Sequence, residues 1–271
     1  MKTIIFTNAR DESNILEWVI HHKNIGFTHV YIFDHISIIP INNILFGLDY
    51  VTVHRVVEDF VPKTQLMLTG AIIARENNYD WMFYLDADEF LALPLFPNVE
   101  SFINNYPNNS QICVNWVMYG TNYLREEPTT TILESYTKYE GLIDQHVKSF
   151  VKPQLVTDVI NPHYYIIDNN HFTSGIILNQ CDPNERAFYP IEPHTPIHVM
   201  HAFIAHYVYQ AYNVYLKRKN GRNRDDINIP HNILDENTLN TLYNNHETTL
   251  IKDLYNENNK IKMQEFLNSI N

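Results

Sequence analysis

The segment best equipped for chemistry is acidic: Asp86 and Asp88, followed by Glu89, come directly after the apolar run WMFYL at 81–85. Burying unpaired carboxylates is costly, so charges at the end of an apolar strand need a partner. Mg²⁺ or Mn²⁺ is one partner, because both ions take carboxylate oxygens together with diphosphate oxygens. Such an ion could also stabilise a nucleoside diphosphate leaving group. An exposed acidic turn or helix cap is the alternative, and the segment alone leaves both open.

The elements that must position this segment alternate along the first 90 residues. Strands are expected at Thr3–Thr7, 28–34, Tyr50–Val56 and 81–85, and helices at 15–25 and Thr64–Asn77. This order predicts an α/β fold with a mostly parallel sheet covered on both faces. Ligands bind beyond the carboxyl ends of such strands. The polar clusters at 8–12 and 86–89 both fall at those ends.

The second half of the chain is less regular. Strands are expected at Gln111–Val117 and Val147–Val151, a long helix from about Ala202 to Lys219, and short packing helices after Asp235. Neither an internal repeat nor a clear linker interrupts the sequence. We therefore expect one domain over 1–271, with parts at 1–90, 91–221 and 222–271.

Several short segments resemble glycosyltransferases of the family 2 and family 92 type, which have a GT-A (Rossmann-like) fold. The opening resembles theirs through NARDE at 8–12, LEW at 16–18, HH at 21–22 and GF at 26–27. The segment YIFDHIS at 31–37 resembles a family strand ending in Asp-Asn-x-Ser, and DWMFYLDADEF at 80–90 resembles the metal-binding segment. Weaker matches follow through 221. Asp11 and His35 depart from the pattern, because the family usually has Asn at both positions.

The resemblance implies an enzyme: a metal-dependent inverting glycosyltransferase that moves a sugar from a nucleotide-sugar, a UDP-sugar, to a glycan or glycoconjugate acceptor. It makes 1–90 the nucleotide-binding half, 91–221 the acceptor half and 222–271 a helical tail. Asp86 and Asp88 would serve the Mn²⁺ or Mg²⁺ ion and the donor. Four further residues would hold the donor's nucleoside end: Thr7, Asn8, Glu12 and Asp34. A helix or turn cap is the alternative for Asp34.

A histidine commonly completes the metal shell in GT-A enzymes, and His206 and His163 are the two candidates. On the expected helix, four polar residues share one stripe, which either faces the diphosphate or is simply solvated: His206, Gln210, Asn213 and Lys217. Lys148 and Lys217 are candidate phosphate contacts, although ordinary surface lysines look the same. An inverting transferase also needs a general base. Glu134 lies roughly where the family has a Glu before an aromatic residue, and a surface Glu is the alternative.

Composition and missing motifs argue against several other classes of protein. The formal net charge of −12 disfavours a sequence-independent nucleic-acid binder. The chain has no glycine-rich phosphate loop and no Asp-x-Asp-x-Thr near its start, which argues against P-loop enzymes and haloacid-dehalogenase phosphatases. No apolar run reaches the ~18 residues of a membrane span, so we expect a soluble cytoplasmic protein. A non-catalytic glycan-binding or assembly protein and a metal-dependent nucleotidyltransferase remain as alternative functions.

Overall fold

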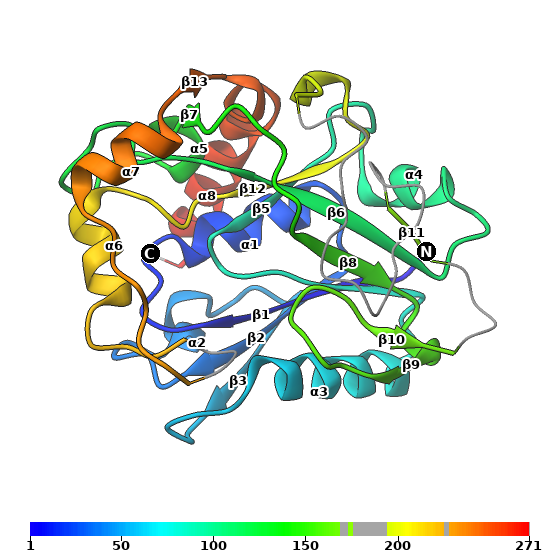
Figure 1. Ribbon diagram of the computed structural model, residues 1–271. Helices are drawn as coiled ribbons and strands as arrows, with labels where there is room; N and C mark the ends of the chain where they lie inside the picture. The colour runs from blue at the N-terminus through cyan, green and yellow to red at the C-terminus, as the bar shows by residue number, and fades with distance from the viewer. Residues whose placement is uncertain (169–172, 176–193, 225–227, 271) are drawn as a thin grey trace.

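The computed structural model describes residues 1–168, 173–175, 194–224 and 228–270. Its centre is a sheet with the strand order β3-β2-β1-β4-β8-β6-β12-β5 (Figure 1). The first four of these strands are parallel to one another: β3 (Val51–Val56), β2 (His29–His35), β1 (Thr3–Ala9) and β4 (Trp81–Tyr84). The mostly parallel α/β sheet predicted from the sequence is therefore confirmed.

The second half of the sheet is mixed. Strand β8 (Val147–Val151) lies antiparallel between β4 and β6 (Gln111–Met118). Strand β12 (Phe203–His206) is parallel to β6 and antiparallel to β5 (Glu89–Ala92). A short strand, β11 (Thr173–Gly175), also pairs with β6. This arrangement places His206 of β12 directly opposite Glu89 of β5, so the acidic segment is joined to the late part of the chain.

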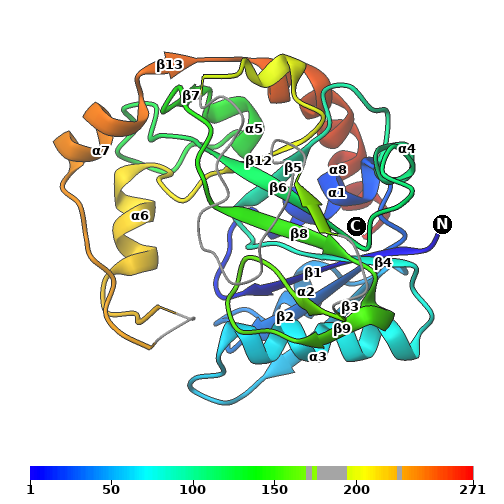
Figure 2. The same cartoon turned by 45° about the vertical axis from the view of Figure 1, so that its right-hand side comes forward.

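Helices cover both faces of the sheet (Figures 1 and 2). Helix α3 (Lys63–Glu76) packs on one face, and α1 (Ile15–Asn24) packs on the other with α8 (Glu257–Ser269) beside it. Trp18 and Val19 of α1 are fully buried in the main apolar core. The remaining helices are α2 (Ile41–Ile44), α4 (Val99–Asn104), α5 (Ile132–Ser135), α6 (Tyr212–Lys219) and α7 (Glu236–Tyr243).

Small elements complete the fold. Two short antiparallel pairs are β9 (Val156–Asp158) with β10 (Ile166–Ile167), and β7 (Lys138–Tyr139) with β13 (His246–Glu247). Two 3₁₀ turns span Pro153–Leu155 and Ile197–Val199, and a π-helical turn at Lys252–Asn256 leads into α8. Helices α7 and α8 confirm the helical tail expected after Asp235. In the described part of the chain, no helix has the length and apolar character needed to cross a bilayer.

The long helix expected from Ala202 to Lys219 is wrong. Residues 203–206 form strand β12, and helix α6 begins only at Tyr212. The apolar run FIA at 203–205 is fully buried and pairs with β6 on one side and β5 on the other. These partners make the run a strand, and the sequence of a short apolar run alone does not show whether it has them. His206 and Gln210 therefore do not share a helical stripe with Lys217.

Candidate active site

The acidic segment forms a tight turn between β4 and β5 that Trp18 of α1 holds in place. The indole Nε1 of Trp18 donates to the backbone oxygens of Asp86, at 3.1 Å, and Glu89, at 2.8 Å. The backbone N–H of Asp86 donates to the Glu89 carboxyl oxygen Oε2 at 2.9 Å. Trp18 of the LEW segment is thus a support for the turn.

Three cationic side chains from distant parts of the chain neutralise the two aspartates. Asp86 accepts hydrogen bonds from Lys63, the first residue of α3, and from Lys148 of β8, with Lys148 Nζ at 3.2 Å. Arg218 of α6 lies 2.8 Å from Asp88. Burial alone would raise both carboxyl pKa values, but the nearby cations outweigh it: the pKa of Asp88 falls to about 2 and that of Asp86 falls well below its usual range. Both side chains are therefore ionised at neutral pH.

Glu89 behaves differently from the two aspartates. Its side chain is completely buried, and burial together with the negative charge of Asp86 raises its pKa to about 8. At neutral pH the side chain is therefore mostly protonated. Its Oε1 has no hydrogen-bond partner within the described structure, although Lys148 Nζ lies 3.6 Å away. Glu89 thus supports the turn as a neutral acid rather than adding a third charge.

His206 is the histidine that contacts these carboxylates. Its Nε2 lies 3.6 Å from Asp88 Oδ1, and burial lowers its pKa to about 4, so the ring is neutral at pH 7. His163 instead donates through Nδ1 to the Val147 backbone oxygen at 3.0 Å, and its ring packs against Trp116. Burial lowers its pKa to about 3.

The donor set near Asp88 suits a divalent cation that is shared with a ligand. Asp88 Oδ1 and neutral His206 Nε2 are a hard oxygen and an imidazole nitrogen, both in the ionisation state that binds metal. Both oxygens of Asp86 are engaged by lysines. No group of three or more His, Cys, Asp or Glu side chains within the described ranges is arranged as a complete metal cage. Mg²⁺-type sites need only one or two carboxylates when substrate phosphates supply other ligands, so the residues present fit such an ion.

A pocket of about 320 Å³ opens beyond the carboxyl ends of β1 and β2. Four isoleucines form its apolar wall: Ile38, Ile39, Ile41 and Ile44. Lys217 and Arg222 lie at its polar side, with Asp11, Glu12 and Ser13 of the β1–α1 loop. Apolar walls with a few polar groups are typical of small-molecule pockets.

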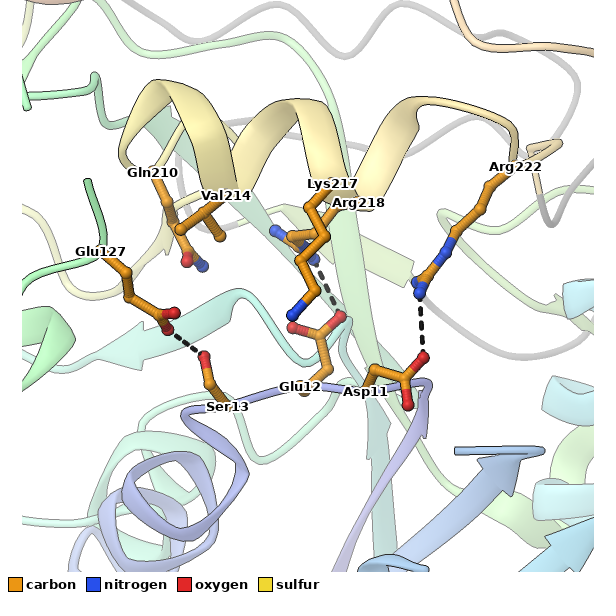
Figure 3. A pocket seen from close by; sticks show the side chains of 9 residues that line it. All are labelled: Asp11, Glu12, Ser13, Glu127, Gln210, Val214, Lys217, Arg218 and Arg222. Carbon is orange, nitrogen blue, oxygen red and sulfur yellow. Dashed lines mark hydrogen bonds and ion pairs between the residues drawn. The ribbon is translucent and has the colours of Figure 1, made fainter. Parts of the chain in front are cut away.

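Helix α6 and the residues just after it are held against the β1–α1 loop by two ion pairs, around a cavity of about 20 Å³ (Figure 3). Arg218 pairs with Glu12 at 3.2 Å as well as with Asp88, and Arg222 pairs with Asp11 at 3.0 Å. Lys217 points toward the loop in the same view. The loop, α6 and the acidic turn therefore form one continuous charged surface next to the larger pocket.

The other residues predicted to bind the nucleotide-sugar lie close to this edge, but their side chains form hydrogen bonds within the protein. Asp34 is 1% exposed; it accepts hydrogen bonds from the backbone N–H groups of Ser37 and Ile41 and from Arg55 at 2.6 Å. Asn8 Oδ1 accepts from the Tyr84 hydroxyl, and the buried Thr7 hydroxyl donates to the Asn8 oxygen. In this structure Asp34 caps the turn after β2.

Glu134 lies on α5, away from these contacts. Its carboxylate pairs with Lys260 of α8 at 3.2 Å, and its backbone N–H is capped by Thr131. Three site residues were missed by the sequence reasoning: Lys63, Arg218 and Arg222. Lys63 carries no sequence signal, since it follows Pro62 as any helix-opening residue could. Arg218 is one residue from the predicted Lys217, and its i,i+4 spacing with Arg222 was the available clue.

Comparisons with known proteins agree with the sequence resemblance. The glycosyltransferase family 92 model matches residues 1–258. A family 92 protein of Ricinus communis is 26% identical over 181 residues, covering 63% of this chain and 33% of that relative. One of Oryza sativa subsp. japonica is 22% identical over 225 residues, covering 80% of this chain and 35% of the relative. The chain thus spans about a third of the length of these curated relatives.

Solved structures show a distant likeness in fold. S. aureus TarS 1–349 in complex with UDP-GlcNAc gives a TM-score of 0.39 at 10% identity, over 56% of this chain and 46% of that one. HddC from Yersinia pseudotuberculosis gives 0.37 at 7% identity, over 64% and 91%. Likenesses this distant carry no information on ligands or activity. The match to the family model over nearly the whole chain is decisive: the protein belongs to glycosyltransferase family 92.

Proposed function

We propose that this chain is a metal-dependent glycosyltransferase of the GT-A type that moves a sugar from a UDP-sugar to a glycan or glycoconjugate acceptor, with inversion. One observation carries the proposal: ionised Asp86 and Asp88 sit at the end of the central strand β4, among three cationic side chains and a neutral histidine. Such a cluster suits a ligand that brings both negative charge and a cation.

The nucleoside end of the donor would occupy the isoleucine-walled pocket. That pocket lies beyond β1 and β2, where parallel sheets bind nucleotides. Its apolar wall suits the face of a base, and Lys217 and Arg222 lie on the side toward the charged surface, where a diphosphate would run. Glu12, already paired with Arg218, would orient that arginine.

Asp88 and His206 would hold a Mn²⁺ or Mg²⁺ ion, with Asp86 beside them. When bound, the ion supplies charge stabilisation to the departing diphosphate. The chain's own cations contribute to the same end: Lys63 and Lys148 are buried beside Asp86, and Arg218 reaches Asp88. Preorganised charges in a site with little water stabilise developing negative charge strongly.

Donor hydrolysis tests this function without knowledge of the acceptor. The protein is incubated with Mn²⁺ and, separately, UDP-glucose, UDP-galactose and UDP-N-acetylglucosamine, and the release of UDP is measured. We expect release from at least one donor, and its loss in Asp88→Ala with the fold retained. Asp80→Asn is the matched control, because Asp80 caps the opposite end of the sheet through the Lys2 backbone N–H. Equal release by the wild type and Asp88→Ala would refute the assignment. Binding of UDP without any release would favour the non-catalytic alternative.

A further inference from the structure

A histidine–aspartate pair lies beside the acidic cluster, on the segment that leads into β8. Asp144 Oδ1 is 2.7 Å from both the Nδ1 and the backbone nitrogen of His146. A carboxylate can only accept here, so the proton of the neutral imidazole is on Nδ1 and the lone pair is on Nε2. The His146 side chain is 43% exposed.

The sheet fixes this pair in position. The backbone N–H of Trp116 on β6 donates to the His146 oxygen at 3.0 Å, and the Trp116 oxygen accepts from the Asp144 N–H at 2.9 Å. The side-chain amide of Asn115 donates to the Asp144 oxygen at 3.0 Å. Although Asp144 and His146 precede β8, these hydrogen bonds to β6 tie their backbone to the sheet, and the Asp144 carboxylate orients the imidazole.

One aromatic ring separates this pair from the proposed metal and donor site. The Trp116 ring stacks on the His146 ring, with 5.1 Å between the ring centroids. It also contacts the His206 ring, whose centroid lies 4.5 Å away. Lys148, which binds Asp86, lies 5.6 Å from the same indole ring. The indole Nε1 is buried and has no hydrogen-bond partner in the described structure. Trp116 as a whole is half-buried, so the part of its ring left exposed beside the imidazole offers an aromatic surface on which a sugar ring can dock.

We propose that His146 is the general base for the acceptor, that Asp144 is its positioning residue, and that the acceptor's sugar ring docks against Trp116. The proposal rests on the proposed function, since it needs a donor bound at Asp86 and Asp88. It places the acceptor on the β6–β8 side of the cluster and the nucleoside on the β1–β2 side.

Transfer of the sugar then occurs in a single displacement at the anomeric carbon. His146 Nε2 takes the proton from the acceptor hydroxyl, and the hydroxyl oxygen forms a bond to the anomeric carbon. The bond from that carbon to the diphosphate oxygen breaks, and its electron pair leaves with the nucleoside diphosphate. The imidazolium is stabilised by ionised Asp144, whose pKa is raised by burial but lowered overall by hydrogen bonds from His146. The products are a glycoside of inverted configuration and the nucleoside diphosphate.

Other acids near the site are less suited to this role. Glu134 is engaged by Lys260. Glu127 accepts a hydrogen bond from Ser13 at the far end of the small cavity, next to α6 (Figure 3). Both carboxylates are thus engaged by other side chains, whereas Asp144 holds the Nδ1 side of His146 and leaves its Nε2 as the basic atom.

The test compares His146→Ala with His29→Ala, a histidine at the start of β2, at the end of that strand away from the site. Each variant is assayed for UDP binding by calorimetry in Mn²⁺, and for UDP release from the donor that the wild type hydrolyses fastest. We expect His146→Ala to lose at least 100-fold in kcat with unchanged UDP affinity, within the range typical of a general base. Added imidazole should restore part of the rate, because the site is open to solvent. Asp144→Asn should also lower kcat and should not respond to imidazole.

Three results would overturn the assignment of His146 as the general base. A wild-type kcat in His146→Ala, or a lost rate that imidazole leaves unchanged, would overturn the assignment of His146 while leaving the donor site intact. A loss of UDP affinity equal to the loss of rate would make His146 a structural residue and also overturn it. If the wild-type protein neither binds UDP nor releases it from any donor, the proposed function fails, and this inference fails with it.

Discussion

Replacing Glu17 by glutamine should change how stability depends on pH, because Glu17 is an acid buried as a helix cap. It is 3% exposed, and its two oxygens accept the backbone N–H groups of Ile132, at 2.7 Å, and Leu133, at 3.2 Å, at the start of α5. Burial raises its pKa to about 7, and the two hydrogen bonds only partly oppose this. Glutamine keeps an acceptor oxygen but cannot ionise.

The sign follows from proton binding. Between the unfolded pKa of 4.5 and the folded pKa of about 7, the folded state binds more protons, so wild-type stability falls as pH rises through this window. The full effect amounts to about 3 kcal/mol above the window, of which about 1 kcal/mol develops between about pH 6 and about pH 8. The stability of Glu17→Gln relative to the wild type should therefore rise by about 1 kcal/mol over that interval.

Urea unfolding at the two pH values measures this difference directly. Glu76→Gln, at the exposed end of α3, is the control for a general change in charge. A relative stability of Glu17→Gln that stays constant from the lower to the higher pH would show that the pKa of Glu17 is not raised on folding. Glu17→Ala should be destabilised at both pH values by about 1–3 kcal/mol for each buried N–H left unpaired.

Three further substitutions test the site. Trp18→Phe keeps a ring in the core but removes the N–H that holds the acidic turn, so stability should fall by about 1 kcal/mol and UDP release should slow; a wild-type rate would show that the turn does not need this support. Lys217→Ala should weaken UDP binding by about 1 kcal/mol, roughly fivefold, in calorimetry at low salt, and unchanged affinity would remove Lys217 from the donor site. Glu134→Gln should cost less than about 1 kcal/mol and leave kcat unchanged, because its carboxylate pairs with Lys260 at the surface. A large loss of kcat would instead return the role of base to Glu134.

The first half of the fold could be predicted because its local signals agree. Alternating apolar strands and amphipathic helices place β1 to β4 within one or two residues of their observed bounds, and their alternation predicts the mostly parallel sheet. Strand β12 could not be predicted in this way. Its apolar residues adopt a strand conformation because they pair with β6 and β5 on either side, and both of these strands lie far away in the sequence. A short apolar run is compatible with either helix or strand until those neighbours are known.

The site was predicted where its residues carry a local motif and missed where only the fold assembles it. Asp86 and Asp88 stand out because charges follow an apolar strand. Lys63 and Arg218 reach them from 23 and 130 residues away along the chain, so their partners are visible only in three dimensions. Trp18 is a related case: the LEW motif marked it, but only the structure shows that its N–H supports the turn.

The placement of the ion and the donor at Asp88 is tested by the dependence of UDP binding on Mn²⁺ in the wild type and in Asp88→Asn, measured by calorimetry. Asparagine keeps the shape of the side chain but removes the charge that Mn²⁺ would need. We expect Mn²⁺ to strengthen UDP binding to the wild type by at least tenfold, and Asp88→Asn to lose this enhancement while it keeps the weaker binding seen without metal. Equal enhancement in both proteins would contradict the placement of the ion and the donor at Asp88.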